Sequence, residues 1–291
     1  MERTPRTDIP ARIGLNTPVV TTYPPPAAGW ETRAGAVELA LIAETADRLG
    51  YSHLTCAEHT AVPTQIADER GGTYWDPLAT LAYLAARTER ITLFTTVLVL
   101  GYHHPLQIAK SYGTLDLLSG GRVTLGLGVG SLEAEFALLD APFEDRGARA
   151  DDAIDALRAA WGTPRPHHNG PYYAFDSVDV TPSSPRRHVD LILGGRTGIS
   201  LRRAVRRGDG WVPFSLPHDT VQQMLERAQP PADFRVVLGT PRLDPIAAPE
   251  AALAELRSMR TAGATDANVT IDATSASHYL EQLHALAELL A

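Results

Sequence analysis

The sequence predicts an α/β protein built as a (β/α)8 TIM barrel, and two observations support this fold class. Strand-like apolar segments alternate with helical segments along the 291 residues, and eight such pairs can be counted. Strands that alternate with helices of this length form βαβ units and a parallel sheet, and eight units fit a closed barrel better than an open doubly wound sheet. No Pro/Gly/Ser-rich linker divides the chain, so we expect residues 1–291 to form one domain.

The expected strands are short, apolar and rich in β-branched residues, and they occupy residues 12–19, 53–59, 91–100, 122–130, 189–195, 210–215, 234–240 and 267–272. The expected helices have apolar residues at helical spacing and occupy residues 36–50, 74–90, 104–121, about 151–161, 199–208, 219–228, 249–263 and 276–290. Gly50 is a typical helix stop, and Asp76 with Pro77 is a typical helix start. Residues 170–182, "GPYYAFDSVDVTP", alternate like a short hairpin and predict an extended insertion after the fourth βα unit.

The composition limits the classes of partner. Apolar residues make up 44% of the chain, but no apolar run approaches the roughly 20 residues that span a bilayer, and no secretory signal precedes the first strand. We therefore expect a cytoplasmic protein that does not bind membranes. The net charge is -8, with no basic tract, which argues against a nucleic-acid partner. Cys56 is the only cysteine, and the HxH and HExxH motifs are absent, so we expect no metal site.

Active sites of such barrels lie at the carboxyl ends of the strands. His59 ends the second strand with the same parity as His53 and Thr55, so it is expected to point inward at the barrel mouth. A histidine there suits proton transfer or the stabilisation of an anionic ring, although strand histidines are often structural. Glu58 falls on the other face and is expected to orient a neighbour or form a salt bridge.

On one face of the fourth strand, glycines stand where larger side chains are usual. Val123, Leu125, Leu127 and Val129 alternate with Thr124, Gly126, Gly128 and Gly130. Glycine inside a strand often marks the close approach of a ligand or another backbone. Two interpretations follow: a flat molecule lies against the upper end of this strand, or a bulky neighbouring residue fills the space.

The turn "GGRTG" lies between a buried strand and a helix. Gly194, Gly195, Arg196 and Thr197 precede a helix N-terminus, where free N–H groups and the helix dipole attract anions. This pattern indicates a phosphate site, and a plain tight turn with Thr197 as N-cap is the competing interpretation. The arginines of "LRRAVRRG", residues 201–208, are expected to form a solvated helix face.

Several motifs carry a resemblance. Residues 74–136, from "YWDPLATLAYLAARTER" through "LDLLSGGR" and "GLGVGSLEAEF", together with "AEHT", "GPYYAFDSV" and "LILGGRTGISLRRAVRRGDGWVP", resemble the bacterial luciferase-like superfamily of flavin-dependent or coenzyme F420-dependent oxidoreductases. The resemblance implies a TIM barrel that holds a flavin or deazaflavin ring at its strand ends. It also implies a bulged third strand at Thr96 and Val97, commonly with a cis peptide, and ring or ribityl contacts at Gly130 and Ser131. It implies that the phosphate lies at Gly194, Gly195, Arg196 and Thr197. The active-site histidine that it implies is His59, and the general acid, as in the sugar-phosphate dehydrogenases of the family, is Glu133.

The motifs "RGARADD" and "GGRTGIS" look closest to the F420 branch, so the resemblance implies hydride transfer between F420 and a small organic substrate, with His59 as proton donor or ring stabiliser. An FMN-dependent monooxygenase is the alternative, and a non-catalytic flavin-binding barrel is a further one. Members of the superfamily are commonly dimers, which implies a homodimer. Tyr23, Trp30, Tyr74 and Trp75, in the loops after the first two strands, are expected either to shape a substrate pocket or to pack in the core.

Overall fold

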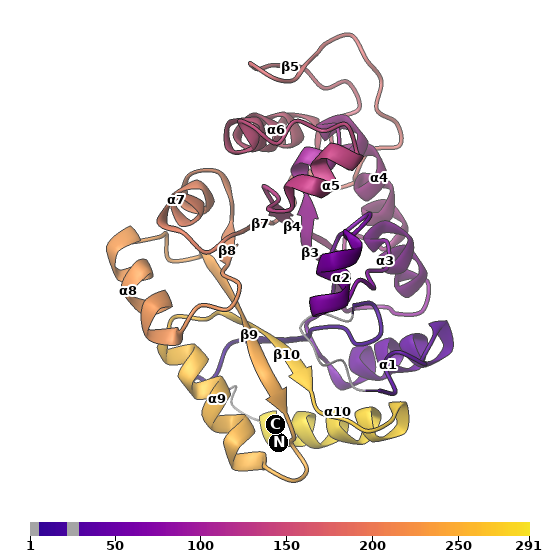
Figure 1. Cartoon of the computed structure of the whole chain (residues 1–291), viewed down its shortest axis with the longest axis vertical. Helices are drawn as coiled ribbons and strands as arrows, with labels where there is room; N and C mark the ends of the chain where they lie inside the picture. Colours follow the sequence, from indigo (N-terminus) through magenta and orange to yellow (C-terminus); the bar gives the residue numbers. More distant parts are fainter. Residues whose placement is uncertain (1–5, 22–28) are drawn as a thin grey trace.

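Eight parallel strands close into a barrel with helices around the outside (Figure 1). The computed structural model describes residues 6–21 and 29–291. The strands follow the circular order β1, β10, β9, β8, β7, β4, β3, β2. The (β/α)8 fold class predicted from the sequence is therefore confirmed. Tyr23, one of the aromatic residues expected either to shape a pocket or to pack in the core, lies outside the described residues.

All eight predicted strands are present in the barrel: β1 (Arg12–Leu15), β2 (His53–Cys56), β3 (Thr92–Val99), β4 (Val123–Gly128), β7 (Leu191–Gly194), β8 (Gly210–Val212), β9 (Arg235–Leu243) and β10 (Asp266–Ile271). The expected helices are α1 (Ala36–Leu49), α3 (Pro77–Ala85), α4 (Pro105–Leu118), α6 (Arg146–Ala160), α7 (Gly198–Arg207), α8 (His218–Ala228), α9 (Pro249–Thr261) and α10 (Ala276–Leu290). Two short helices in the loops after β2 and β4 add to them, α2 (Thr64–Arg70) and α5 (Glu133–Leu138).

The insertion between α6 and β7 is the expected hairpin, with the antiparallel strands β5 (His168–Asn169) and β6 (Ala174–Phe175). Asp152 of α6 holds it in place, because this carboxylate bonds to the His168 ring at 2.9 Å and accepts from the backbone N–H groups of Tyr172 and Tyr173, both at 2.8 Å. In Figure 1 the hairpin projects beyond α6, outside the helix ring. It therefore elaborates the outer surface and leaves the barrel intact.

The glycines of β4 make room for the neighbouring strand β3. A Cβ atom on Gly126 would lie 2.0 Å from the carbonyl oxygen of Thr95, and one on Gly128 would lie 2.7 Å from Val97. The pairing register of β3 with β4 shifts between Thr95 and Leu98, so β3 bulges at this point. Protein atoms thus fill the space beside β4. Of the two interpretations of these glycines, the structure supports filling by a neighbour.

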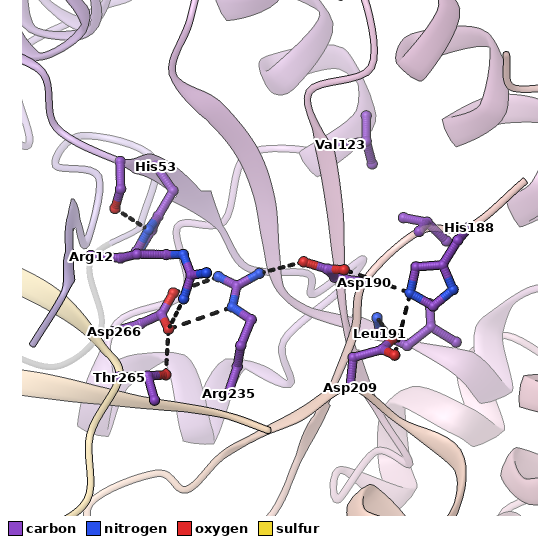
Figure 2. A network of polar contacts seen from close by, with 12 residues as sticks. Arg12, His53, Val123, His188, Asp190, Leu191, Asp209, Arg235, Thr265 and Asp266 are labelled. Atoms are coloured by element: carbon purple, nitrogen blue, oxygen red, sulfur yellow. Dashed lines mark hydrogen bonds and ion pairs between the residues drawn. The ribbon is translucent and has the colours of Figure 1, made fainter. Parts of the chain in front are cut away.

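The barrel interior is apolar in the middle and charged at the amino end of the strands. Four buried side chains form a layer that we call the lumen cluster: Phe94, Ile192, Val212 and Val237. Beneath it, the buried Asp266 pairs with Arg235 at 2.5 Å (Figure 2). The His53 ring bonds to Asn268 at 2.5 Å. Burial lowers the pKa of His53 from its ordinary value. This polar layer closes the end of the barrel opposite the candidate site.

Candidate functional site

The strand topology brings most of the predicted site residues to one rim. Parallel strands of a closed barrel end at the same side, so the segments that follow β2, β3, β4 and β7 share the carboxyl rim. His59, the Thr96–Val97 bulge, Gly130 with Ser131, and the turn from Gly194 to Thr197 all lie there. Glu133 begins α5 on this rim, but it is exposed.

His59 is held by a buried carboxylate that sequence reasoning missed. Nδ1 of His59 lies 2.6 Å from Oε2 of Glu135, whose side chain is fully buried. Oε1 of Glu135 accepts from the backbone N–H groups of Thr60 at 2.5 Å and Ala61 at 3.0 Å. Burial alone raises the pKa of Glu135, but the hydrogen bonds from His59 and Ala61 outweigh it and hold the pKa below its usual value. Glu135 is therefore ionised at neutral pH and fixes the imidazole.

The tautomer of His59 follows from this contact. An ionised carboxylate only accepts hydrogen bonds, so Nδ1 carries the proton that points to Glu135. Nε2 makes no hydrogen bond within the part of the chain that the structure describes. The ring also packs edge-on against Tyr74, with ring centroids 4.5 Å apart. Tyr74 thus packs on the ring of His59, whereas Trp30 is buried, and its indole N–H donates to the carbonyl of Ala273 at 2.8 Å.

Glu58 bonds to a neighbouring side chain, which matches the orienting role, one of the two expected of it. Its Oε1 lies 2.6 Å from Nε2 of His103, and its Oε2 accepts from the backbone N–H of Val99 at 2.6 Å. Glu58 is buried, so these contacts fasten the end of β2 to the end of β3. His103 is thus a second histidine at the carboxyl rim, and the sequence predicted no role for it.

The β3 bulge places an unsatisfied hydroxyl at the rim. The Thr96–Val97 peptide is cis, as the resemblance implied. The Oγ1 atom of Thr96 is buried and has no hydrogen-bond partner among the described residues. A buried unpaired hydroxyl costs free energy, so such a group calls for an explanation, and a bound ligand is one. Val97 packs against the lumen cluster.

Open space lies across the barrel from the Thr96 hydroxyl, on the wall that β9 forms. Gly239 of β9 has the same strand parity as Val237 of the lumen cluster, so its missing side chain would point inward. A Cβ atom built on Gly239 would meet nothing within 4 Å. Between the lumen cluster and the carboxyl rim, β9 therefore leaves an unfilled space beside Gly239. We refer to this room as the Gly239 space.

The turn after β7 is organised as a capped helix start. Oγ1 of Thr197 accepts from the backbone N–H of Ser200 at 3.2 Å, and Oγ of Ser200 accepts from the backbone N–H of Thr197 at 3.1 Å. Thr197 is therefore the N-cap, the plainer of the two interpretations of this turn. The N–H groups of Gly198 and Ile199, in the first turn of α7, have no helical partner. These two N–H groups lie beside the cap at the start of the helix.

A second cluster of ionisable groups lies at the opposite rim. His188, Asp190 and Asp209 bring potential ligand atoms within 4.8 Å of one another (Figure 2). Asp190 already pairs with Arg235 at 2.8 Å, and Asp209 pairs with Arg158 at 2.5 Å. Both carboxylates are therefore balanced by arginine, and this cluster is explained by ion pairs.

Known proteins are similar to this chain in sequence. A family model described as luciferase-like monooxygenase matches residues 17–289. An F420-dependent glucose-6-phosphate dehydrogenase of Nocardia farcinica is 33% identical over 183 residues, which are 61% of this chain and 53% of that protein. The chain thus aligns with about half the length of this relative.

Solved structures share the fold. The monooxygenase RslO1 from Streptomyces bottropensis superposes with a TM-score of 0.73 at 24% identity, over 95% of this chain and 98% of that one. An F420-dependent secondary alcohol dehydrogenase in complex with an F420-acetone adduct superposes with a TM-score of 0.70 at 13% identity, over 96% and 99% of the two chains. None of the described helices is both long and apolar enough to cross a membrane.

Proposed function

The chain belongs to the luciferase-like monooxygenase family of oxidoreductases, and from that premise we propose that it transfers a hydride between coenzyme F420 and a small organic substrate. The observation that carries this proposal is the His59–Glu135 pair, at 2.6 Å, on the same rim as the unpartnered Thr96 hydroxyl. The choice of F420 rests on the resemblance of "RGARADD" and "GGRTGIS" and on the similarity to an F420-dependent dehydrogenase.

The residues at the rim fit a planar polar heterocycle with an anionic chain. The Thr96 hydroxyl would bond to a polar edge of the ring, and the Gly239 space would take part of its area. Gly130 and Ser131 are the proposed ring or ribityl contacts. The turn Gly194, Gly195, Arg196 and Thr197 would hold the phosphate at the start of α7, where the N–H groups of Gly198 and Ile199 have no helical partner.

The bound deazaflavin supplies hydride chemistry, since its ring carries carbon where flavin has N5, and the protein supplies position and charge. His59 holds or moves the proton that accompanies hydride transfer, through Nε2, while Glu135 keeps Nδ1 protonated and the ring in place. Glu133, the general acid implied by the resemblance, is exposed, so the buried Glu135 takes the place of Glu133 in this proposal.

Titration of the purified protein with F420 and with FMN, side by side, tests the cofactor. We expect submicromolar affinity for F420 alone. Tight binding of FMN alone would instead support the alternative, an FMN-dependent monooxygenase. His59→Ala tests the proton-transfer role: we expect normal cofactor binding and a loss of turnover of about 100-fold or more in a substrate screen. Normal turnover in this variant would remove the role proposed for His59.

Two finer proposals concern the setting of the enzyme. We propose a homodimer, because members of the resembled superfamily are commonly dimers, and a cytoplasmic location. Sedimentation of the purified protein and fractionation of the source cells test them.

A further inference from the structure

A groove lined by arginines runs between α6 and α7 on the outside of the barrel, where the two helices lie side by side (Figure 1). It encloses about 400 Å³ and is lined by Asp151, Ile199, Arg202, Arg203, Arg206 and Arg207. Four of its six lining residues are cations and one is an anion, in a chain whose net charge is -8. The groove is therefore a local positive surface on an acidic protein.

Two of these arginines have structural partners. Nε of Arg203 lies 2.5 Å from Oδ1 of Asp151, and Arg207 pairs with Asp155, so both connect α7 to α6. Arg202 and Arg206 are exposed and form no ion pair or hydrogen bond with residues 6–21 or 29–291. They lie four residues apart on one helix face, where like charges repel each other slightly. The solvated face expected from the sequence thus contains two charges that helix packing does not explain.

The position of Arg202 connects the groove with the carboxyl rim. A Cβ atom on Gly198, the first residue of α7, would lie 3.3 Å from Nη1 of Arg202. The guanidinium therefore lies beside the helix N-terminus, where the helix dipole disfavours a cation and favours an anion. Gly198 directly follows the turn proposed for the phosphate. The groove thus begins where the phosphate would be held and continues down α7 past Arg206.

We propose that this groove binds a polyanionic chain that continues from the cofactor phosphate. The inference rests on the proposed function, because it takes the turn from Gly194 to Thr197 as the phosphate site. F420 continues beyond its phosphate into a chain of glutamates, whereas FMN ends at the phosphate. Carboxylates along that chain pair with Arg202 and Arg206, and the exposed Ile199 contacts the apolar parts of the chain. The groove accordingly gives the protein a means of preferring F420 over FMN.

Deazaflavin fluorescence titrations at low salt test the proposal, with F420 carrying several glutamates, F420 without glutamates, and FMN. We expect wild-type protein to bind the glutamylated form about 10-fold more tightly than the form without glutamates, since two exposed charge contacts of this kind together reach that factor. In R202E/R206E the two forms should bind within about 2-fold of each other, because the paired charges are reversed. Added salt should reduce the wild-type preference, because exposed charges are screened.

The control is R33E/R227E, which makes the same change in net charge at two exposed arginines away from the groove. It should keep the wild-type preference for the glutamylated form. The proposal is overturned if wild-type protein binds both forms of F420 equally, if R202E/R206E weakens both forms to the same extent, or if the control also loses the preference.

Binding of a polyanion in the absence of the cofactor tests this inference independently of the proposed function. Calorimetry with a γ-linked glutamate trimer and no cofactor should show binding to wild type and to R33E/R227E but not to R202E/R206E. That result supports the groove even if neither form of F420 binds, in which case only the proposed function fails. Equal binding of the trimer to all three proteins, or to none, overturns the proposal that the groove binds a polyanionic chain.

Discussion

Nδ1 of His59 lies 2.6 Å from Oε2 of Glu135, although the two residues are 76 positions apart in the chain and come from different βα loops. The pair depends on the short helix α5, which places Glu135 inward and leaves Glu133 exposed. Residues two apart in a helix point about 200° apart around its axis, so only one of these glutamates can face the barrel. Helix geometry therefore decides which of the two glutamates contacts His59.

Replacing each of the two glutamates distinguishes their roles. We expect Glu135→Gln to lower kcat/KM by about 10-fold to 100-fold, because the charge that fixes and supports the His59 ring is removed. The pH dependence of kcat/KM should also change. Glu133→Gln, on the same helix, should stay within about 2-fold of wild type, as most exposed substitutions do. Equal losses in the two variants would contradict the assignment of Glu135.

Removing the unpartnered hydroxyl of Thr96 is predicted to increase the stability of the protein and to weaken its binding of F420. Thr96→Val should raise the free energy of unfolding of the cofactor-free protein by about 1 kcal/mol, because a buried unsatisfied group is removed. It should also weaken F420 binding, because the ring loses a hydrogen bond. Thr95→Val is the matched control: its hydroxyl donates to the carbonyl of Gly126 at 2.9 Å, so its loss should lower stability by about 1 kcal/mol. Denaturant titrations of both variants measure the difference, and a stability loss in Thr96→Val would contradict the account.

Gly126→Ala tests how tightly β3 packs on β4. The added methyl group would lie 2.0 Å from the backbone carbonyl of Thr95, which cannot move without disturbing the bulge. We expect a loss of stability of about 1 to 3 kcal/mol or more, as in other overpacked cores. Thermal and denaturant unfolding measure it, and a neutral effect would show that the strand can shift.

The buried Asp266 predicts a defined pH dependence of stability. Burial raises the pKa of Asp266, but the charge of Arg235 and its hydrogen bond to this carboxylate outweigh burial and lower the pKa below its usual value. The stability from this group is therefore present above the unfolded pKa of about 3.9 and is lost as the pH falls through the lower folded pKa. We expect Asp266→Asn to cost about 3 to 5 kcal/mol at pH 7, because Arg235 loses a buried partner, and to lose less stability than wild type on acidification. The exposed Asp233→Asn is the control, with the wild-type profile.

Much of the fold could be predicted from the sequence, because strand and helix periodicities are local signals. All eight barrel strands were expected. The sequence predicts a helix start near residue 151, but α6 begins at Arg146. Its N-cap, Asp145, makes no side-chain cap bond, and Gly147 in the first turn obscures the pattern. Arg203 bonds to the carbonyl of Gly147 at 3.2 Å, a long-range contact that the local sequence does not reveal.

The candidate site could be predicted less completely. His59, the cis peptide at Thr96 and the rim position of the β7 turn follow from strand ends and from the resemblance. The filling of the β4 glycines by β3 and the burial of Glu135 depend on contacts between distant segments. Parity along a strand says which face a residue occupies. It does not say what the neighbouring strand places there.

The Gly239 space gives the most direct test of the central claim that the carboxyl rim holds the F420 ring. Gly239→Leu adds a side chain where a Cβ meets nothing within 4 Å, so the protein should fold with nearly wild-type stability. Fluorescence titration of wild type and of this variant with F420 is the decisive measurement. The account predicts tight binding to wild type and a loss of affinity of at least about 10-fold in the variant, as expected when a ligand group and a side chain compete for one space. Equal affinity in two equally stable proteins would contradict it.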